Sequence, residues 1–178
     1  MDWDHRDRPA LGDPVEVVDY DASWAELFRR ERERLRAALG ALAAAVEHVG
    51  STAVPGLAAK PVLDILVGAA PFPLPDDALA ALAALGYEYR GDNGVPGRQF
   101  FRTNPRTRHL DVVELGGEEW QHLIVFRDYC RTHPDVAREY EALKRKLATE
   151  HPHERARYTE GKAAFIEAVL RRAQADAR

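Results

Sequence analysis

The sequence predicts an α/β (α+β) fold, in which a mixed β-sheet is flanked by helices and followed by a C-terminal helical segment. Two observations support this class. Up to residue 115 the chain contains several short segments that are apolar or alternate with the period of two expected of strands. After Gly116 and Gly117 the apolar residues recur with a period near 3.6, which is typical of amphipathic helices.

The predicted strands differ in how deeply they are buried. The segment 62–67 is apolar except for Asp64, which predicts a buried central strand. The strands on either side of residues 91–97 are expected to form a hairpin with a long connection. Residues 15–18 alternate briefly and predict an edge strand. The strands of the sheet are expected near residues 45–49, 62–67, 87–90, 98–103 and 109–115.

Helix signals lie before, within and after these strands. Ser23 and Glu26 have the spacing of a capping box, which predicts the start of a long helix. The run of alternating charges in residues 29–34 is expected to be the solvated face of that helix. A short helix is expected to be capped by Asp76 or Asp77. The C-terminal segment is expected to hold one helix around Trp120–Arg127, a second from Pro134 to Leu147, and a last one from Tyr158 to Leu170.

Length and composition indicate one domain over residues 14–176, preceded by a flexible tail of residues 1–13. Hydrophobic residues make up 46% and charged residues 30%, as in soluble globular proteins. The net charge is −4 and no stretch is densely basic, so nucleic acid is not expected as the main partner. Cys130 is the one cysteine, which excludes a disulfide framework and a cysteine-based zinc site. The sequence has no long apolar run and no signal-peptide pattern. We therefore expect a cytoplasmic location and no membrane partner.

The segment 48–67 carries the most unusual chemistry of the chain. A strand runs into Gly50, Ser51 and Thr52, whose backbone N–H groups and hydroxyls suit a phosphate group. After a turn rich in proline and glycine, Asp64 stands alone among apolar residues. An ionised carboxylate in such a strand needs a cationic partner. The segment therefore predicts a site for an anionic ligand beside an acidic strand.

This segment is not a P-loop. A P-loop requires a shorter spacing between its two glycines and a lysine directly after the second, whereas five residues separate Gly50 from Gly56 and Lys60 lies further on. A P-loop kinase or ATPase is therefore not expected. The alternative to a phosphate-binding loop is a tight turn built by these glycines.

The stretch from His48 to Asp64 resembles the GrpB family, which is placed in the nucleotidyltransferase superfamily. The resemblance covers nearly everything from Val15 to Leu170. In that superfamily a Gly-Ser pair contacts nucleotide phosphates and an acidic strand holds Mg²⁺, so the resemblance implies a nucleotidyltransferase-like fold and an NTP substrate. It continues through Tyr87-Glu-Tyr-Arg90, Phe100-Phe-Arg102, His109-Leu-Asp-Val-Val-Glu114, His122-Leu, Phe126-Arg-Asp-Tyr129 and Tyr158-Thr-Glu-Gly-Lys162.

The sequence departs from the superfamily pattern in its acidic residues. The usual strand carries two carboxylates separated by one residue, so that both face one side, but Leu66 occupies the second position here. Asp111 shares a strand face with His109, at a position where the family more often has a second histidine. Asp111 is thus the best candidate to meet Asp64. We expect Asp64 and Asp111 to bind Mg²⁺ and, together with His109, to form the catalytic group.

Two alternatives to this Mg²⁺ site stay open. His48 and His109, with one carboxylate, would instead suit a transition metal. An aspartate bonded to backbone N–H groups would have a purely structural role.

Four further side chains are expected to bind the nucleotide. Lys60 precedes the Asp64 strand, and Arg102 presents a guanidinium that suits phosphate. Tyr158 and Lys162 lie four residues apart and are expected to be adjacent on one helix.

Two functions follow from these residues. The first is metal-dependent transfer of a nucleotidyl group from an NTP to a small-molecule acceptor. The second is a non-catalytic nucleotide- or metabolite-binding module, accessory to coenzyme A metabolism, because some relatives resemble this domain fused to dephospho-CoA kinase. The sequence leaves the acceptor, the preferred base and the oligomeric state open.

Overall fold

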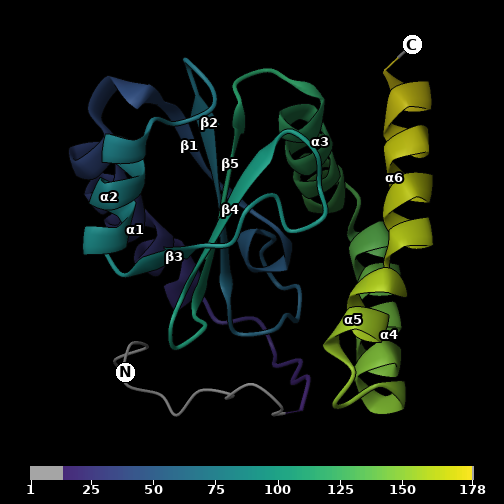
Figure 1. The fold of residues 1–178 in the computed structure, drawn as a ribbon. Helices are drawn as coiled ribbons and strands as arrows, with labels where there is room; N and C mark the ends of the chain where they lie inside the picture. The colour runs from purple at the N-terminus through teal and green to yellow at the C-terminus, as the bar shows by residue number, and fades with distance from the viewer. Residues whose placement is uncertain (1–13, 178) are drawn as a thin grey trace.

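The computed structural model describes residues 14–177, whose arrangement is shown in Figure 1. One sheet contains five strands in the order β1-β2-β5-β4-β3. β2 and β5 are parallel, and the other neighbours are antiparallel, so the sheet is mixed as predicted. The predicted tail of residues 1–13 lies outside the described residues. The strands are β1 (Ala43–Val49), β2 (Leu63–Ala69), β3 (Tyr87–Tyr89), β4 (Arg98–Thr103) and β5 (Arg108–Glu114).

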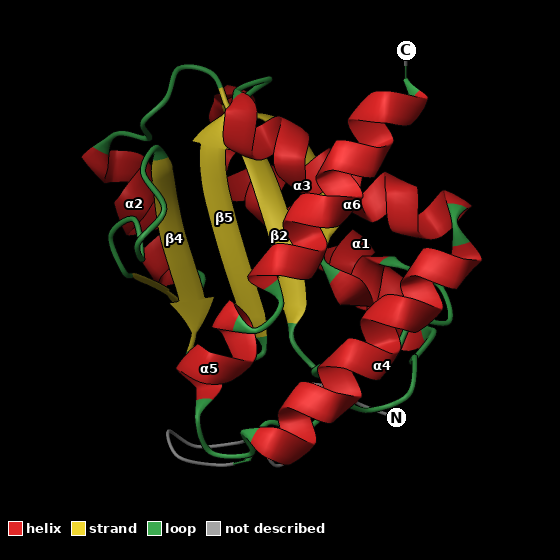
Figure 2. Ribbon diagram, turned by 90° about the vertical axis from the view of Figure 1, so that its right-hand side faces the viewer, coloured by secondary structure: helices red, strands yellow, loops and turns green. Residues whose placement is uncertain are grey.

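Helices cover both faces of the sheet. In Figure 1, α1 and α2 lie on one side, and α3 with the C-terminal helices lies on the other. Figure 2 shows α4, α5 and α6 in front of the sheet, with α5 near the ends of β4 and β5. No helix within residues 14–177 combines the length and the apolar character needed to span a membrane. The helices are α1 (Ser23–Leu39), α2 (Asp76–Ala84), α3 (Glu118–Thr132), α4 (Pro134–Glu150), α5 (Arg155–Glu160) and α6 (Ala163–Asp176).

The two faces of the sheet follow from the strand period. One face carries Ile65, Val67, Leu110 and Val112, which are fully buried in the main core together with apolar residues of α1 and α2. The α1 side of this core is an apolar stripe that includes Trp24, Leu35 and Leu39.

The other face is only partly covered by α3. Trp120 of α3 packs against Leu66 and Val113, further along β2 and β5. Gly68 permits this close approach, because a Cβ there would lie 2.8 Å from the Trp120 ring. Helix α3 therefore covers the later part of the parallel strands. The first part of each strand faces the C-terminal helices instead, and it is there that a cavity forms.

The C-terminal helices pack against the loop before β2 as well as against one another. Val54 and Leu57 of that loop are buried with Cys130, Tyr140 and Val169, which belong to α3, α4 and α6. This packing holds α6 beside the loop.

The predicted helix caps were wrong. Ser23 is the first residue of α1, and its side chain caps nothing. The N-cap residue is Ala22, and Oδ1 of the preceding Asp21 accepts the Ser23 N–H at 2.9 Å. The capping box requires the serine to precede the helix, so Glu26 has no reciprocal role here. At α2 the preceding proline is the N-cap residue, so neither Asp76 nor Asp77 holds that position.

Two segments near the ends of the described chain also differ from the prediction. The edge strand expected at residues 15–18 is reduced to a single bridge between Val18 and Ala59. The last predicted helix is interrupted at Gly161, so Tyr158 and Lys162 do not share one helix. Close packing explains the glycine, since a Cβ at Gly161 would lie 2.6 Å from the side chain of Leu147.

The charged face of α1 was predicted to be solvated, but one of its residues is buried. Glu31 is only 2% exposed. The hydroxyl of Tyr87 donates to its carboxylate at 3.0 Å, and the guanidinium groups of Arg34 and Arg108 lie 2.7 Å and 3.2 Å from it. Glu31 thus links α1 to β3 and β5 from inside the protein.

Candidate functional site

The centre of the site is a pair formed across the two parallel strands. Asp64 of β2 lies opposite His109 of β5, and its Oδ1 is 3.0 Å from Nδ1 of the imidazole. Burial raises the pKa of Asp64, but the His109 hydrogen bond and the charges of His109, Lys60 and Lys162 outweigh it, so the pKa is lowered. The predicted cationic surroundings of Asp64 are therefore present, and its carboxylate is ionised at neutral pH.

Asp111 faces the same side of the sheet, as predicted, but it has its own partner. The residue opposite Asp111 on β2 is Leu66, which stands where the superfamily usually has its second carboxylate. Arg98 donates from Nη1 to Asp111 Oδ1 at 2.9 Å. Burial raises the pKa of Asp111 to about 7, and the charge of Asp64 contributes, although Arg98 opposes both. Asp111 is thus a guanidinium-paired acid that is only partly ionised near neutral pH.

Arg98 also holds the loop that borders the site. Its guanidinium donates to the backbone carbonyl oxygens of Asp92 at 3.1 Å and Asn93 at 3.2 Å. Asn93 and Val95 of this loop line the cavity. Asp111 therefore anchors the loop through Arg98.

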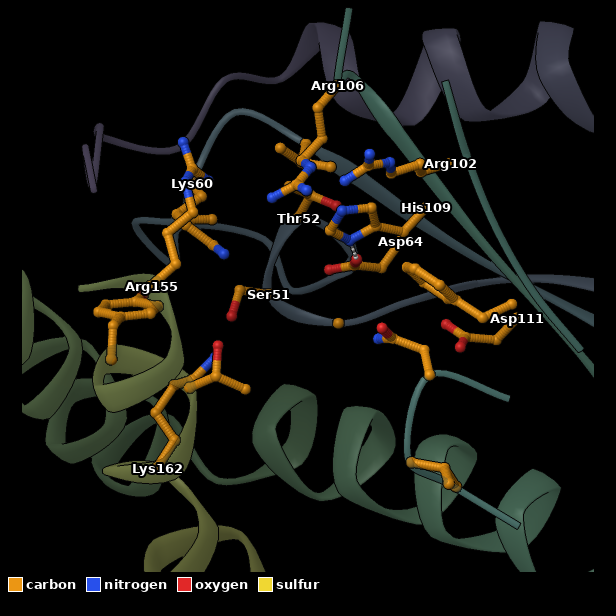
Figure 3. Close-up of a pocket in the computed structure, with 18 of the residues that line it drawn as sticks. Ser51, Thr52, Lys60, Asp64, Arg102, Arg106, His109, Asp111, Arg155 and Lys162 are labelled. Atoms are coloured by element: carbon orange, nitrogen blue, oxygen red, sulfur yellow. Dashed lines mark hydrogen bonds and ion pairs between the residues drawn. The ribbon is translucent and has the colours of Figure 1, made fainter. Parts of the chain in front are cut away.

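The turn after β1 offers free backbone donors. Gly50 has φ +70°, and residues 51–53 form a single turn of 3₁₀ helix, η3 (Ser51–Ala53). Ser51 and Thr52 are its first residues, so their N–H groups have no partner within it. Neither N–H donates to another backbone group within residues 14–177. In Figure 3 the Ser51 side chain points into the cavity.

The cavity beside this turn has a volume of about 720 Å³. Every residue predicted for the Mg²⁺ site or the nucleotide site lies in its wall, and Figure 3 shows many of them converging on it. The predicted residues are Gly50, Ser51, Thr52, Lys60, Asp64, Arg102, His109, Asp111, Tyr158 and Lys162.

Two lysines meet at one aromatic ring in this wall. The ammonium groups of Lys60 and Lys162 lie 5.1 Å and 4.7 Å from the centre of the Tyr158 ring, within cation–π distance. Burial, together with the charge of Lys162, lowers the pKa of Lys60 to about 8. Burial also lowers the pKa of Lys162, so both ammonium groups gain from an anion that enters the cavity.

Several cations of the wall were not predicted from the sequence. Arg106 lies in the loop before β5, and Arg155 begins α5. Lys144 of α4 is 2% exposed, donates to the carbonyl oxygen of Ala58, and has its pKa lowered to about 7 by burial and by Lys162. Lys144 gave a signal, since it occupies a position in the apolar stripe of its helix.

His48 does not join the site. Its Cα partner across β2 is Ile65, which places it on the opposite face from Asp64 and His109. Its Nε2 is 2.9 Å from the Thr52 hydroxyl, and its ring stacks on Phe28 at 4.8 Å. The structure thus does not bring His48 and His109 together for a transition metal.

The residues present do not fit a resident Mg²⁺ ion. Asp111 is paired with Arg98, Asp64 is paired with His109, and Leu66 supplies no oxygen. No group of three or more histidine, cysteine or acidic side chains within the described chain could hold a metal. The cavity wall is also rich in cations, which repel a divalent cation and attract an anion.

Replacing Gly50 by alanine should destabilise the protein more than the same change at Gly56. Both residues have φ in the left-handed region, but a Cβ at Gly50 would lie 2.4 Å from Asp64 Oδ2, whereas Gly56 has open space. We expect Gly50→Ala to lower the free energy of unfolding by about 1–3 kcal/mol more than Gly56→Ala, because of the added overpacking. Chemical denaturation measures the difference. Equal losses would contradict the close approach of Gly50 to Asp64.

The fold and the site define a class of protein, a small α/β domain with a mixed five-stranded sheet and a cationic cavity beside a Gly-Ser turn. A model of the family described as GrpB protein matches residues 14–172. The chain belongs to the GrpB family.

Two longer proteins each contain a region similar to this chain. The chain is 38% identical over 154 residues to the UPF0157 protein YqkA of Bacillus subtilis, a match that covers 85% of this chain and 45% of YqkA. It thus spans less than half of that relative. It is 29% identical over 161 residues to a dephospho-CoA kinase of Mycolicibacterium paratuberculosis, covering 74% of this chain and 39% of that protein.

Solved structures confirm the fold. The crystal structure of the conserved protein GrpB from Enterococcus faecalis matches with a TM-score of 0.83 and 34% identity, over 91% of this chain and 99% of that one. A chain of the GLD-2/RNP-8 complex matches with a TM-score of 0.52 and 11% identity, over 83% and 60%. At that identity the likeness shows the fold alone.

Proposed function

We propose that this protein binds a nucleoside triphosphate, or a closely related polyphosphate, in the cavity between β2, β5 and the C-terminal helices. The observation that carries the proposal is the charge of the wall, where eight lysine and arginine side chains face three carboxylates. Among the described residues, only Arg98 and Arg102 of these eight have a carboxylate within 4.0 Å. Such uncompensated like charge favours an anionic ligand.

The geometry suggests how the phosphates are held. The N–H groups of Ser51 and Thr52 suit one phosphate, as in other backbone anion sites. Lys60 and Lys162, which share the Tyr158 ring, lie across the same cavity as ammonium donors. The arginines of the wall add planar donors that pair well with phosphate oxygens. In this arrangement side-chain cations neutralise the phosphate charge.

Metal-dependent nucleotidyl transfer to a small acceptor is the second candidate. One observation favours it: Asp64 and Asp111 face the same side of neighbouring strands and line the same cavity as the Gly-Ser turn. A bound triphosphate would add the oxygens that these two side chains lack. Against this candidate, both carboxylates already have a hydrogen-bonded partner.

The match to a dephospho-CoA kinase suggests a second ligand to test beside NTPs. The matched region is only part of that protein, which fits a module accessory to coenzyme A metabolism. Dephospho-CoA carries an adenosine and a pyrophosphate, so it presents the same chemistry as an NTP. It therefore belongs in the ligand screen beside the four NTPs.

Calorimetric titration with ATP, in EDTA and in Mg²⁺, distinguishes the candidates. We expect similar affinity in both buffers, because the protein's own cations take the phosphate charge. A ligand at about 100 times its Kd should also raise the free energy of unfolding by about 2.7 kcal/mol. If neither NTPs nor dephospho-CoA bind or stabilise the protein, the proposal fails. If binding needs Mg²⁺ and is lost in Asp64→Asn, the second candidate is preferred.

A further inference from the structure

The His109 imidazole is held in one orientation at the wall of the cavity. Its Nδ1 is bonded to Asp64 at 3.0 Å, and its ring packs against Phe100 with 5.4 Å between ring centres. The ring is buried except for 19% of its side-chain surface, and it lines the cavity. Figure 3 shows the bond between the two residues from the side of the cavity.

The bond to Asp64 fixes which nitrogen carries the proton. An ionised carboxylate can only accept, so whenever the ring is neutral its Nδ1 must be the donor. The lone pair is then on Nε2, as in catalytic triads in which an aspartate orients a histidine. Nε2 has no hydrogen-bond partner among residues 14–177. No hydroxyl or thiol of the described chain is therefore placed to give it a proton, so its reaction partner must come from the ligand.

The proposed ligand brings an electrophile to this lone pair. A phosphoanhydride phosphorus is hard to attack because its oxygens are negative, and enzymes overcome this with cations around the phosphate chain. Here lysine and arginine side chains surround the cavity that His109 lines. The site thus combines an oriented nucleophile with charge neutralisation that requires no metal.

We propose that His109 accepts a nucleotidyl group on Nε2, which makes the protein a metal-independent nucleotidyltransferase. This inference rests on the nucleotide binding proposed above. Nε2 attacks the α-phosphorus of an NTP, the Nε2–P bond forms, and the bond from phosphorus to the bridging oxygen of the leaving pyrophosphate breaks. The imidazole then bears a positive charge opposite Asp64. In the second step an acceptor hydroxyl or water attacks phosphorus, the N–P bond breaks, the acceptor proton passes to solvent, and the neutral ring is restored.

Labelling of the whole protein in EDTA tests this step. The protein is incubated with ATP labelled at the α- or the γ-phosphate, denatured in alkali, and assayed for covalent label by gel and intact mass. We expect label from α-labelled ATP only, stable in alkali and lost in acid, as for a phosphoramidate of histidine. Label from the γ-phosphate instead, or no covalent label at all, would overturn the proposal.

Three variants test whether His109 is the residue that carries the covalent label. His109→Gln should lose it entirely. Asp64→Asn should bind ATP as the native chain does but label about 100-fold more slowly, because the orientation and charge opposite the ring are lost. His122→Gln is the matched control, since His122 is a partly exposed histidine 3.8 Å from a carboxylate but outside the cavity, and it should label normally.

ATP affinity of each variant is measured by calorimetry beside its labelling. Normal binding without label would sink the His109 inference and leave the binding proposal standing. Absence of binding in the native chain would sink the binding proposal itself. Label that persists in His109→Gln would place the nucleophile elsewhere and contradict the inference.

Discussion

The double variant Lys60→Met/Lys162→Met is expected to bind ATP at least about 100-fold more weakly than the native protein. Each ammonium group is proposed to make a charge-assisted hydrogen bond to phosphate, and such bonds are worth about 1.5–3 kcal/mol each. Two together give about 3 kcal/mol or more, which corresponds to two or more factors of ten in Kd. Methionine keeps a long apolar stem against Tyr158, so the fold should be retained. Calorimetry in EDTA measures the change.

Lys146→Met is the control for this variant. Lys146 belongs to α4, its side chain is 69% exposed, and it pairs at 3.8 Å with Glu150, outside the cavity. Its replacement should leave the ATP affinity unchanged. The affinity of the native protein should fall as the pH rises through about 8, because Lys60 loses its charge there. The double variant should lack that decline, and unchanged affinity in the double variant would disprove the role of the lysine pair.

Glu31→Ala is expected to lower the free energy of unfolding by about 3–5 kcal/mol. The carboxylate is buried, and its removal takes the acceptor from the Tyr87 hydroxyl and breaks the ion pair to Arg108, whose side chain is 14% exposed. Leaving a buried charge without its partner is the costly part of such a change. Urea denaturation followed by circular dichroism gives the value.

Two companion variants make this test specific. Glu33→Ala, on the same helix but 63% exposed and paired with Arg29 at 3.1 Å, should cost less than about 1 kcal/mol. Glu31→Gln should cost less than Glu31→Ala, because an amide oxygen still accepts the Tyr87 hydroxyl. Similar losses at Glu31 and Glu33 would mean that the buried link carries no stability.

The strands were predictable because strand period and apolar content are local properties, and all five expected segments form the sheet. The pairing of the site was harder. The side of the sheet to which a side chain points follows from the strand period of two. Asp64 and Asp111 could therefore be placed on the same side from the sequence. The register between two strands does not follow from this period. A shift of two residues keeps every side chain on its face of the sheet but changes the residue opposite it on the neighbouring strand. The actual register gives Asp64 the imidazole of His109, and leaves Asp111 to Arg98.

The other residues whose role was not predicted also owe their surroundings to contacts between distant parts of the chain. Glu31 lies in a run of alternating charges that is typical of a solvated face, and only the approach of β3 and β5 buries it. Arg106 and Arg155 lie in or beside loops, where no period marks their direction. Lys144 could have been recognised, because it falls four residues after Tyr140 on the buried side of α4. A lysine in an apolar stripe is a sign of a special environment.

The cavity wall joins the turn at Gly50–Thr52 to the junction of α5 and α6, which is synthesised much later. While the chain emerges from the ribosome, the sheet strands are complete before Tyr158 and Lys162 exist. Nascent protein that has folded only its N-terminal part therefore has half of an anion site. Because a ligand stabilises only the state that binds it, a polyphosphate would protect finished molecules and not truncated ones. Ligand occupancy would thus mark molecules in which α5 and α6 have docked against the sheet.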